Sequence, residues 1–339
     1  MSGTGFGSPD HPYVEMPLAG YSAEVHWAKG VASWPTMPFS YLERLVQPSP
    51  AMADSYTGTA AFWLRVNGTM AGENPGSPSL GTTDGIPIVF VIGPRHLAGE
   101  GGRGGHDQGF YIRVRGNADF FQVQVTLDRI IGNIRVLIEP VDTVFGTTRS
   151  LPGNLCDEKW AHFLMNWDFS TGAGAGKLIV NKVERTIYPQ SNSYDFVAPV
   201  LDIKTPSEIP ARVPWGQPAR FFGAHTVLGE EGVPPQLVPA APMNENYKLS
   251  LAHVWISAQH KLDDVSKFVT EDNTPAKLGS NGEVVTVDVN GVVTGEFKPD
   301  FYFRGGPGEF VKNLGLGGEV KLVGDLPPIS QSISPKIGT

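Results

Sequence analysis

The sequence predicts an all-β protein, an antiparallel sandwich of two facing sheets, and three observations support this fold class. Apolar and polar residues alternate with a period of two in many short runs. Glycine and proline are abundant, at 41 and 29 of 339 residues, while charged residues make up only 18%. Only one short segment has helical periodicity. This composition favours short strands joined by tight turns. It disfavours a fold in which strands alternate with long surface helices.

The alternating runs are the expected strands. In the run 110–115, Phe110, Ile112 and Val114 share one face. One apolar and one wet face is typical of an antiparallel sheet packed on one side. The run 88–92 is apolar throughout and predicts a strand buried on both faces. Similar alternation occurs in the runs 59–66, 120–127 and 133–139.

Turns and a short helix complete the local pattern. Gly116-Asn117 and Asn290-Gly291 are hairpin signals. Asp263 is the expected cap of a helix of about two turns. Its apolar stripe consists of Leu262, Val265, Phe268 and Val269.

Charge and composition exclude several classes of function. The net charge is −8 and no Lys/Arg cluster is present, so we expect no nucleic-acid partner. No apolar run reaches the length of a membrane span, and the first ten residues lack the features of a secretory signal. We therefore expect synthesis in a cytoplasm and no membrane association. The single cysteine, Cys156, excludes an intrachain disulfide.

Residues 160–188 form the most informative segment. They predict a strand (160–167), a Gly-rich turn, a second strand (177–181) and a tight turn into a third strand (183–188). The first strand has large side chains on both faces and should be covered on both sides. One face carries Trp160, His162 and Leu164, and the other carries Phe163, Met165 and Trp167.

This segment resembles laminin-G-like and concanavalin A-like domains. In those domains a Trp-x-His strand leads to an Asp-containing turn and then to an aliphatic strand that ends in Asn-Gly. The matching residues are Trp160, His162, Asp168, Leu178, Val180 and Asn181. Lys182 stands where the family usually has glycine, so either Lys182 adopts a positive φ or the turn type differs. The resemblance implies a jelly roll with a lectin-like fold.

Three further segments extend the resemblance over residues 20–270 in the expected order. Residues 61–65 resemble an early core strand, 220–223 the strand before the last one, and 247–269 the last core strand with a following short helix. Residues 299–324 resemble the Gly/aromatic segment that follows the jelly roll in structural proteins of tailed phages. It contains a Pro-x-aromatic-Tyr strand, then Phe310, Asn313, Gly315, Gly317 and Gly318.

These matches imply four regions. We expect an extended N-terminal arm (1–20), a laminin-G-like jelly roll (21–272), a β-hairpin with a Gly/aromatic extension (273–326) and a Pro/Ser-rich tail (327–339). Neither the arm nor the tail can bury much surface by itself, so each is free or is ordered by a neighbouring subunit.

No catalytic residue, cofactor site or metal site is predicted. The chain lacks the Glu-x-Asp-x-x-Glu triplet that glycosidases of this fold use, and it lacks a Gly-x-Ser-x-Gly elbow. His162 and His253 lie inside strands and are expected to be core or interface residues. Asp84, Asp107 and Asp168 are loop candidates for calcium by position only, and we interpret them as solvated carboxylates.

Trp215 is the one weak candidate for glycan binding. It lies in the loop sequence Val-Pro-Trp-Gly-Gln-Pro, where an indole could stack on a sugar or could equally fill the edge of the core.

Three hypotheses for function follow. The first is a non-enzymatic structural protein of a bacteriophage virion, such as a decoration, head-fibre or tail-associated subunit, which associates with itself and with other virion proteins. The second is a carbohydrate-binding module for host-surface glycans. The third is a divergent glycoside hydrolase.

Overall fold

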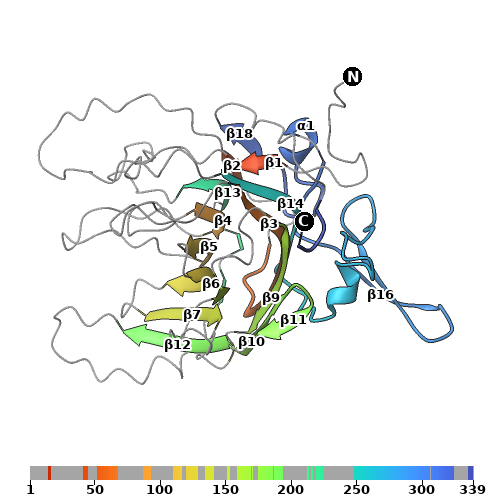
Figure 1. Cartoon of the computed structure of the whole chain (residues 1–339), viewed down its shortest axis with the longest axis horizontal. Coiled ribbons are helices and arrows are strands. Elements are labelled where there is room, and N and C mark those ends of the chain that lie inside the picture. The colour runs from red at the N-terminus through yellow and green to blue at the C-terminus, as the bar shows by residue number, and fades with distance from the viewer. Residues whose placement is uncertain are drawn as a thin grey trace, which may run out of the picture.

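Figure 1 shows the computed structural model of the chain. The structure describes residues 14–16, 41–44, 52–67, 87–92, 110–116, 120–128, 134–140, 151–152, 159–168, 170, 175–185, 187–193, 212–213, 215–216, 219–224, 248–305, 307–323 and 335–338.

Within these residues the chain forms two large antiparallel sheets, and the predicted fold class is confirmed. Sheet A has the strand order β1-β14-β3-β9-β10-β11, and β17 also pairs with β14. Its strands are β1 (Val14–Met16), β3 (Thr57–Asn67), β9 (Ala161–Asp168), β10 (Ala175–Val180), β11 (Val183–Arg185), β14 (Lys248–Ser257) and β17 (Phe301–Phe303).

Sheet B has the strand order β12-β7-β6-β5-β4-β13-β2-β18, and β8 also pairs with β6. Its strands are β2 (Tyr41–Arg44), β4 (Pro87–Ile92), β5 (Phe110–Gly116), β6 (Phe120–Asp128), β7 (Ile134–Pro140), β8 (Leu151–Pro152), β12 (Ile187–Ser193), β13 (Ala219–Ala224) and β18 (Lys321–Val323). Each run in which the sequence predicts a strand overlaps one of these strands, except that the predicted strand 183–188 is divided between β11 and β12, which lie in different sheets.

Aromatic side chains fill the space between the two sheets. The ring of Phe110 on β5 lies 4.7 Å from Trp167 on β9, measured between centroids, and Phe221 on β13 lies 4.7 Å from Phe301 on β17. Tilted ring pairs at this spacing add to the stability that burial of their apolar area provides. The sheets therefore face each other across a continuous apolar core.

The other face of sheet A is also covered, by chain that follows β14. Trp63, Leu164 and Trp255 on the sheet belong to one buried cluster with Phe268 and Val284 from that segment. In Figure 1 the blue C-terminal part lies beside sheet A, on the side away from β4–β7. This second layer explains why seven of the eight residues of β9 are buried, as predicted from its large side chains on both faces.

The C-terminal segment is joined to both sheets. Its strand β17 pairs with β14 in sheet A, and β18 pairs with β2 in sheet B. Part of the predicted tail is also bound to its own chain: the N–H of Ile337 donates to the carbonyl of Asn273, and the N–H of Gly338 donates to that of Trp160. For residues 335–338, therefore, the expectation of a free or partner-ordered segment is wrong.

The predicted helix is shorter than expected. Residues Val265–Lys267 form a single 3-10 turn (η3), and its cap is Asp264, not Asp263. An Asp264 carboxylate oxygen accepts the N–H of Ser266 at 3.0 Å. Phe268 and Val269 of the apolar stripe are nevertheless buried in the apolar cluster that covers the outer face of sheet A, which we call the outer cluster. A second short helix, α1 (Pro307–Phe310), was not predicted.

Candidate functional site

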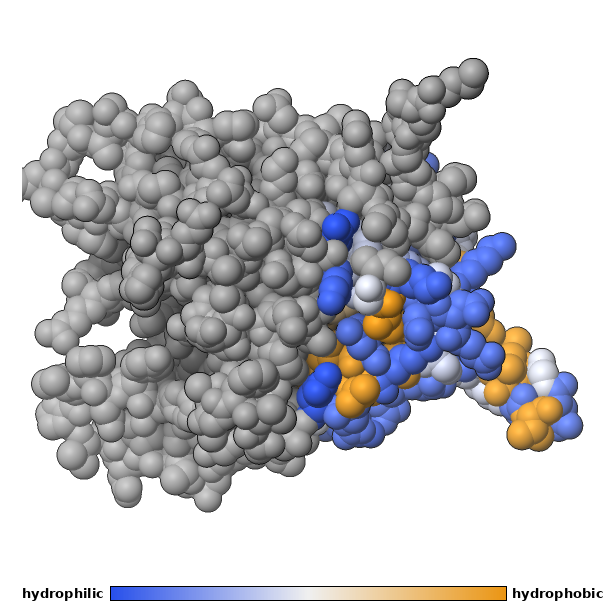
Figure 2. Space-filling view, in the orientation of Figure 1, coloured by the Kyte–Doolittle hydropathy of each residue, from blue (hydrophilic) through white to orange (hydrophobic). Residues whose placement is uncertain are grey.

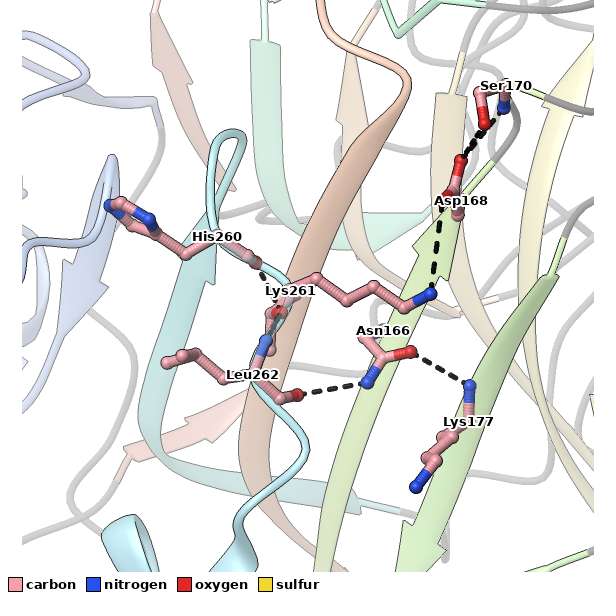
Figure 3. A network of polar contacts seen from close by, with 8 residues as sticks. Asn166, Asp168, Ser170, Lys177, His260, Lys261 and Leu262 are labelled. Atoms are coloured by element: carbon pink, nitrogen blue, oxygen red, sulfur yellow. Dashed lines mark hydrogen bonds and ion pairs between the residues drawn. The ribbon is translucent and has the colours of Figure 1, made fainter. Parts of the chain in front are cut away.

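Asp168, the one calcium candidate within the described residues, lies at the end of β9 in a polar network (Figure 3). Its carboxylate accepts the N–H of Ser170 at 3.0 Å and the hydroxyl of Ser170 at 2.6 Å, and lies 3.9 Å from the ammonium of Lys261. Burial acts to raise the pKa of Asp168, but these hydrogen bonds and Lys261 outweigh it and hold the pKa below its usual value. The carboxylate is thus already paired with its own chain.

The rest of this network fastens the connection after β14 to sheet A. The side-chain amide of Asn166 donates to the carbonyl of Leu262 at 3.0 Å and accepts the N–H of Lys177 at 2.9 Å. The hydroxyl of Thr59 donates to the carbonyl of His260 and accepts the N–H of Leu262. Each side chain satisfies backbone groups that would otherwise be buried without partners, which is a structural role.

Metal ligation finds no support in the described part of the chain. No group of three or more His, Cys, Asp or Glu residues that could hold an ion occurs there. Asp84, Asp107 and Cys156 lie outside the described residues.

Trp215, the weak glycan candidate, is a core residue, so its interpretation as an exposed sugar platform is wrong. It is fully buried, with 0% of its surface exposed. Its indole N–H donates to the hydroxyl of Ser55 at 2.8 Å, and its ring stacks on Phe90 and Trp167. The indole is therefore covered by the protein's own side chains.

His162 is also buried, as predicted for a strand histidine. Its ring lies between Trp63 and Phe268, and its Nδ1 has no hydrogen-bond partner. Burial, with a smaller contribution from His253, lowers the pKa of His162 to about 3. The ring is therefore neutral over the physiological range, and its burial keeps it from a substrate.

The turn between β10 and β11 shows why asparagine follows the aliphatic strand. Asn181 and Lys182 both have positive φ, at 51° and 67°. The Asn181 side chain accepts the N–H of His162 at 2.8 Å, which ties the turn to β9. Lys182 takes the left-handed conformation usual for glycine, and its ammonium donates to the carbonyl of Thr270 at 2.7 Å.

A buried Arg44 and Asp300 were not identified from the sequence, because nothing local distinguishes them. Arg44 donates to the carbonyls of Gly317 at 2.9 Å and Trp215 at 2.5 Å, and its guanidinium lies 5.1 Å from the centroid of the Phe301 ring. Burial lowers the pKa of Arg44 to about 10 and raises that of Asp300 to about 6. Both side chains lie in the interior, so we assign them to the assembly of the fold.

Among the described residues, the most exposed apolar feature is a hairpin in the C-terminal segment. Strands β15 (Val284–Val287) and β16 (Val293–Phe297) form a separate two-stranded sheet, and Figure 1 shows it projecting from the body. In Figure 2 the outer end of this projection carries hydrophobic surface. We call residues 284–297 the valine hairpin. Its exposed hydrophobic residues are Val285 (45%), Val287 (51%), Val289 (101%), Val292 (60%) and Val293 (60%).

Asn290-Gly291 predicts this hairpin, but that dipeptide does not mark it as a site. The signal was present: residues 284–295 contain six valines and a single charged residue, Asp288. Such a strand pair would ordinarily be buried on one face and polar on the other. Among the described residues, no helix is long and apolar enough to cross a membrane.

Comparisons with known proteins identify similar folds. No family model and no curated protein matches the sequence. Three solved structures have 8–10% sequence identity to the chain. A native heptameric SAP-like pentraxin from Limulus polyphemus has a TM-score of 0.40, with 76% of this chain and 79% of that chain covered.

The second is the mouse laminin alpha1 chain, domains LG4-5, with a TM-score of 0.30; 72% of this chain and 42% of that chain are covered. The third is the T. cruzi calreticulin globular domain, with a TM-score of 0.31 and coverages of 75% and 82%. All three have concanavalin A-like jelly-roll folds. Similarities this distant carry no information about a ligand or partner of this chain.

Proposed function

We propose that this chain is a non-catalytic structural subunit of a bacteriophage particle that acts by binding other proteins of the particle. The observation that carries the proposal is the valine hairpin, a projecting element whose outer residues are apolar. Exposed apolar surface that a chain does not bury itself is typical of protein–protein contacts.

The phage assignment rests on the resemblance of residues 299–324 to the Gly/aromatic segment of tailed-phage structural proteins, and residues of this segment have identifiable structural roles in the chain. The Asn313 amide accepts the N–H of Tyr302 and donates to the carbonyl of Asp300, so it closes the loop after α1 onto β17. At Gly315 and Gly317, a Cβ would lie 2.5 and 2.6 Å from the carbonyl oxygen of Asp300. The motif thus packs the loop after α1 closely against β17.

The other two hypotheses have less support. Glycan binding was motivated by the jelly-roll fold, which the chain has, and by Trp215, whose side chain is buried. Glycoside hydrolysis needs a pair of carboxylates at the scissile bond, and the sequence lacks the glycosidase triplet.

Mass spectrometry of purified virions from a host that carries the gene tests the proposal. We expect peptides of this chain at the abundance of a structural protein. Their absence from the particles would overturn the phage assignment. A glycan array provides the second test: strong binding to a defined glycan would instead favour the carbohydrate-binding module.

A further inference from the structure

The two faces of the valine hairpin have different environments. On the inner face, Val284 is buried in the cluster that covers sheet A, and its cross-strand partner Phe297 packs against the same cluster. Cross-strand partners lie on one face of a sheet, and so do residues two apart on a strand. Val285, Val287 and Val293 therefore share the outer face, where each is about half exposed or more.

The tip of the hairpin is ordered by its own hydrogen bonds. The Asp288 carboxylate accepts the N–H groups of Asn290 and Val292, both at 2.8 Å, and the backbone N–H of Asp288 donates to the carbonyl of Val292. These bonds hold Val289 and Val292 outward in a defined turn. A preorganised apolar element loses little conformational entropy when it binds.

The charge distribution favours contact at this end of the molecule. The chain has a net charge of −8, so two copies repel each other over much of their surface. Within residues 284–295 the only charge is that of Asp288, whose carboxylate is bonded to its own turn. On the outer face Glu296 lies opposite Val285, and its carboxylate pairs with the ammonium of Lys298 at 3.3 Å. Two hairpins can therefore meet without an unpaired charge between their valines.

The size of the patch limits how strong a contact it can make. The five valines expose on the order of 300 Å² of apolar surface. A stable interface needs about 800 Å² per partner, of which slightly more than half is apolar. A two-fold contact of two such patches buries on the order of 600 Å² in total, which is the size of a weak contact. It brings apolar area against apolar area on both sides.

We infer that the outer face of the valine hairpin packs against the same face of a second copy of this chain, about a two-fold axis. This inference rests on the proposed role in assembly and names the partner. The contact is small, so the dimer is weak and is available for further assembly.

Sedimentation velocity of the full chain tests the inference over concentrations of about 1 to 200 µM. We expect the mean mass of the wild type to rise from one chain towards two. In the double variant Val287→Ser/Val293→Ser, the dissociation constant should increase at least tenfold. The matched control is Val183→Ser on β11, since Val183 is also 51% exposed but lies away from the hairpin. Circular dichroism establishes that all three proteins are folded.

A wild type that stays at the mass of one chain throughout, or a double variant that dimerises like the wild type, would overturn the inference. A Val183→Ser variant with equally weakened dimerisation would do the same. The outcome is independent of the phage assignment. A monomeric chain found in virions would refute only the two-fold contact, and a dimeric chain absent from virions would refute only the assignment.

Discussion

The guanidinium of Arg44 donates a 2.9 Å hydrogen bond to the backbone carbonyl of Gly317, a residue 273 positions later in the chain. In chain order, β2 is the first strand of sheet B and β18 is the last. Arg44 lies on β2, Gly317 shortly precedes β18, and the two strands pair directly. A second bond from Arg44 reaches the carbonyl of Trp215, so one side chain joins three distant parts of the sequence.

Replacement of Arg44 should be strongly destabilising. In Arg44→Met the carbonyls of Gly317 and Trp215 lose a charged donor in the interior, and Asp300 loses its nearest compensating charge. We expect the free energy of unfolding to fall by about 3–5 kcal/mol, measured by guanidinium denaturation. The control is Arg212→Met, which removes an exposed cation–π contact with Tyr56 and should cost less than about 1 kcal/mol. Equal losses in the two variants would contradict this role of Arg44.

Asp300 should make stability decrease as the pH rises. Burial raises its pKa from 3.8 to about 6, so the folded chain holds this proton more tightly than the unfolded chain. Its contribution is greatest below pH 4 and is lost as the pH rises through 6. The difference in unfolding free energy between wild type and Asp300→Asn should shrink by about 2 kcal/mol from pH 4 to pH 7. A difference that does not change with pH would show that the carboxyl is ionised throughout.

His162 should make stability decrease as the pH falls, which is opposite to the effect of Asp300. Burial lowers its pKa from 6.5 to about 3, so the unfolded chain binds the proton more readily. The contribution of the neutral ring is complete above pH 6.5 and is lost as the pH falls. Between pH 7 and 4.5, wild type should lose about 2–3 kcal/mol more stability than His162→Phe, which keeps a ring in contact with Trp63. Parallel pH profiles from denaturant titrations would refute the prediction.

Gly58 on β3 should not tolerate a side chain. A Cβ there would collide with the ring of Trp167 and would lie 2.7 Å from the carbonyl oxygen of Ser257. We expect Gly58→Ala to lower the unfolding free energy by about 2–3 kcal/mol and to reduce the thermal midpoint. Gly308→Ala is the control, because a Cβ at Gly308 meets nothing within 4 Å. A stable Gly58→Ala protein would mean that the Trp167 ring moves easily.

The turn at Lys182 should be improved by glycine. Lys182 has a φ of 67°, a conformation in which a Cβ is unfavourable. Both Lys182→Gly and Lys182→Ala lose the hydrogen bond to Thr270, but only the glycine variant relieves the backbone strain. We expect Lys182→Gly to be more stable than Lys182→Ala by about 1 kcal/mol in thermal denaturation. A reversed order would show that the turn does not need the left-handed conformation.

The strands could be predicted because their signal is local. Alternation in the run 110–115 requires one wet and one buried face, whatever the strand pairs with, and β5 indeed occupies residues Phe110–Gly116. The helix was less predictable, because the spacing of apolar residues from Leu262 to Val269 is compatible with two structures. One is a helix of two turns, and the other is a single 3-10 turn followed by buried residues. Tertiary contacts of Phe268 with Trp255 decide between these alternatives.

The candidate site could be predicted only in part. Asn290-Gly291 marked the hairpin, but the exposure of its valines depends on how much of it the outer cluster covers. Trp215 illustrates the opposite case, because its local sequence is compatible with an exposed loop as well as with the core. Its burial follows from Phe90 and Trp167, which are 125 and 48 residues away in the sequence but stack on its ring.

By itself the sequence determined that this protein is built of antiparallel strands, where most of them lie, and that Asn181 turns one into the next. Only the tertiary structure decided that the chain after β14 covers the outer face of sheet A, that Arg44 and Asp300 are buried, and that Val285, Val287 and Val293 are left uncovered. The physical reason is the sequence distance over which each feature is determined. A strand's alternation depends on its own residues, whereas burial of a given face depends on segments that return from far along the chain.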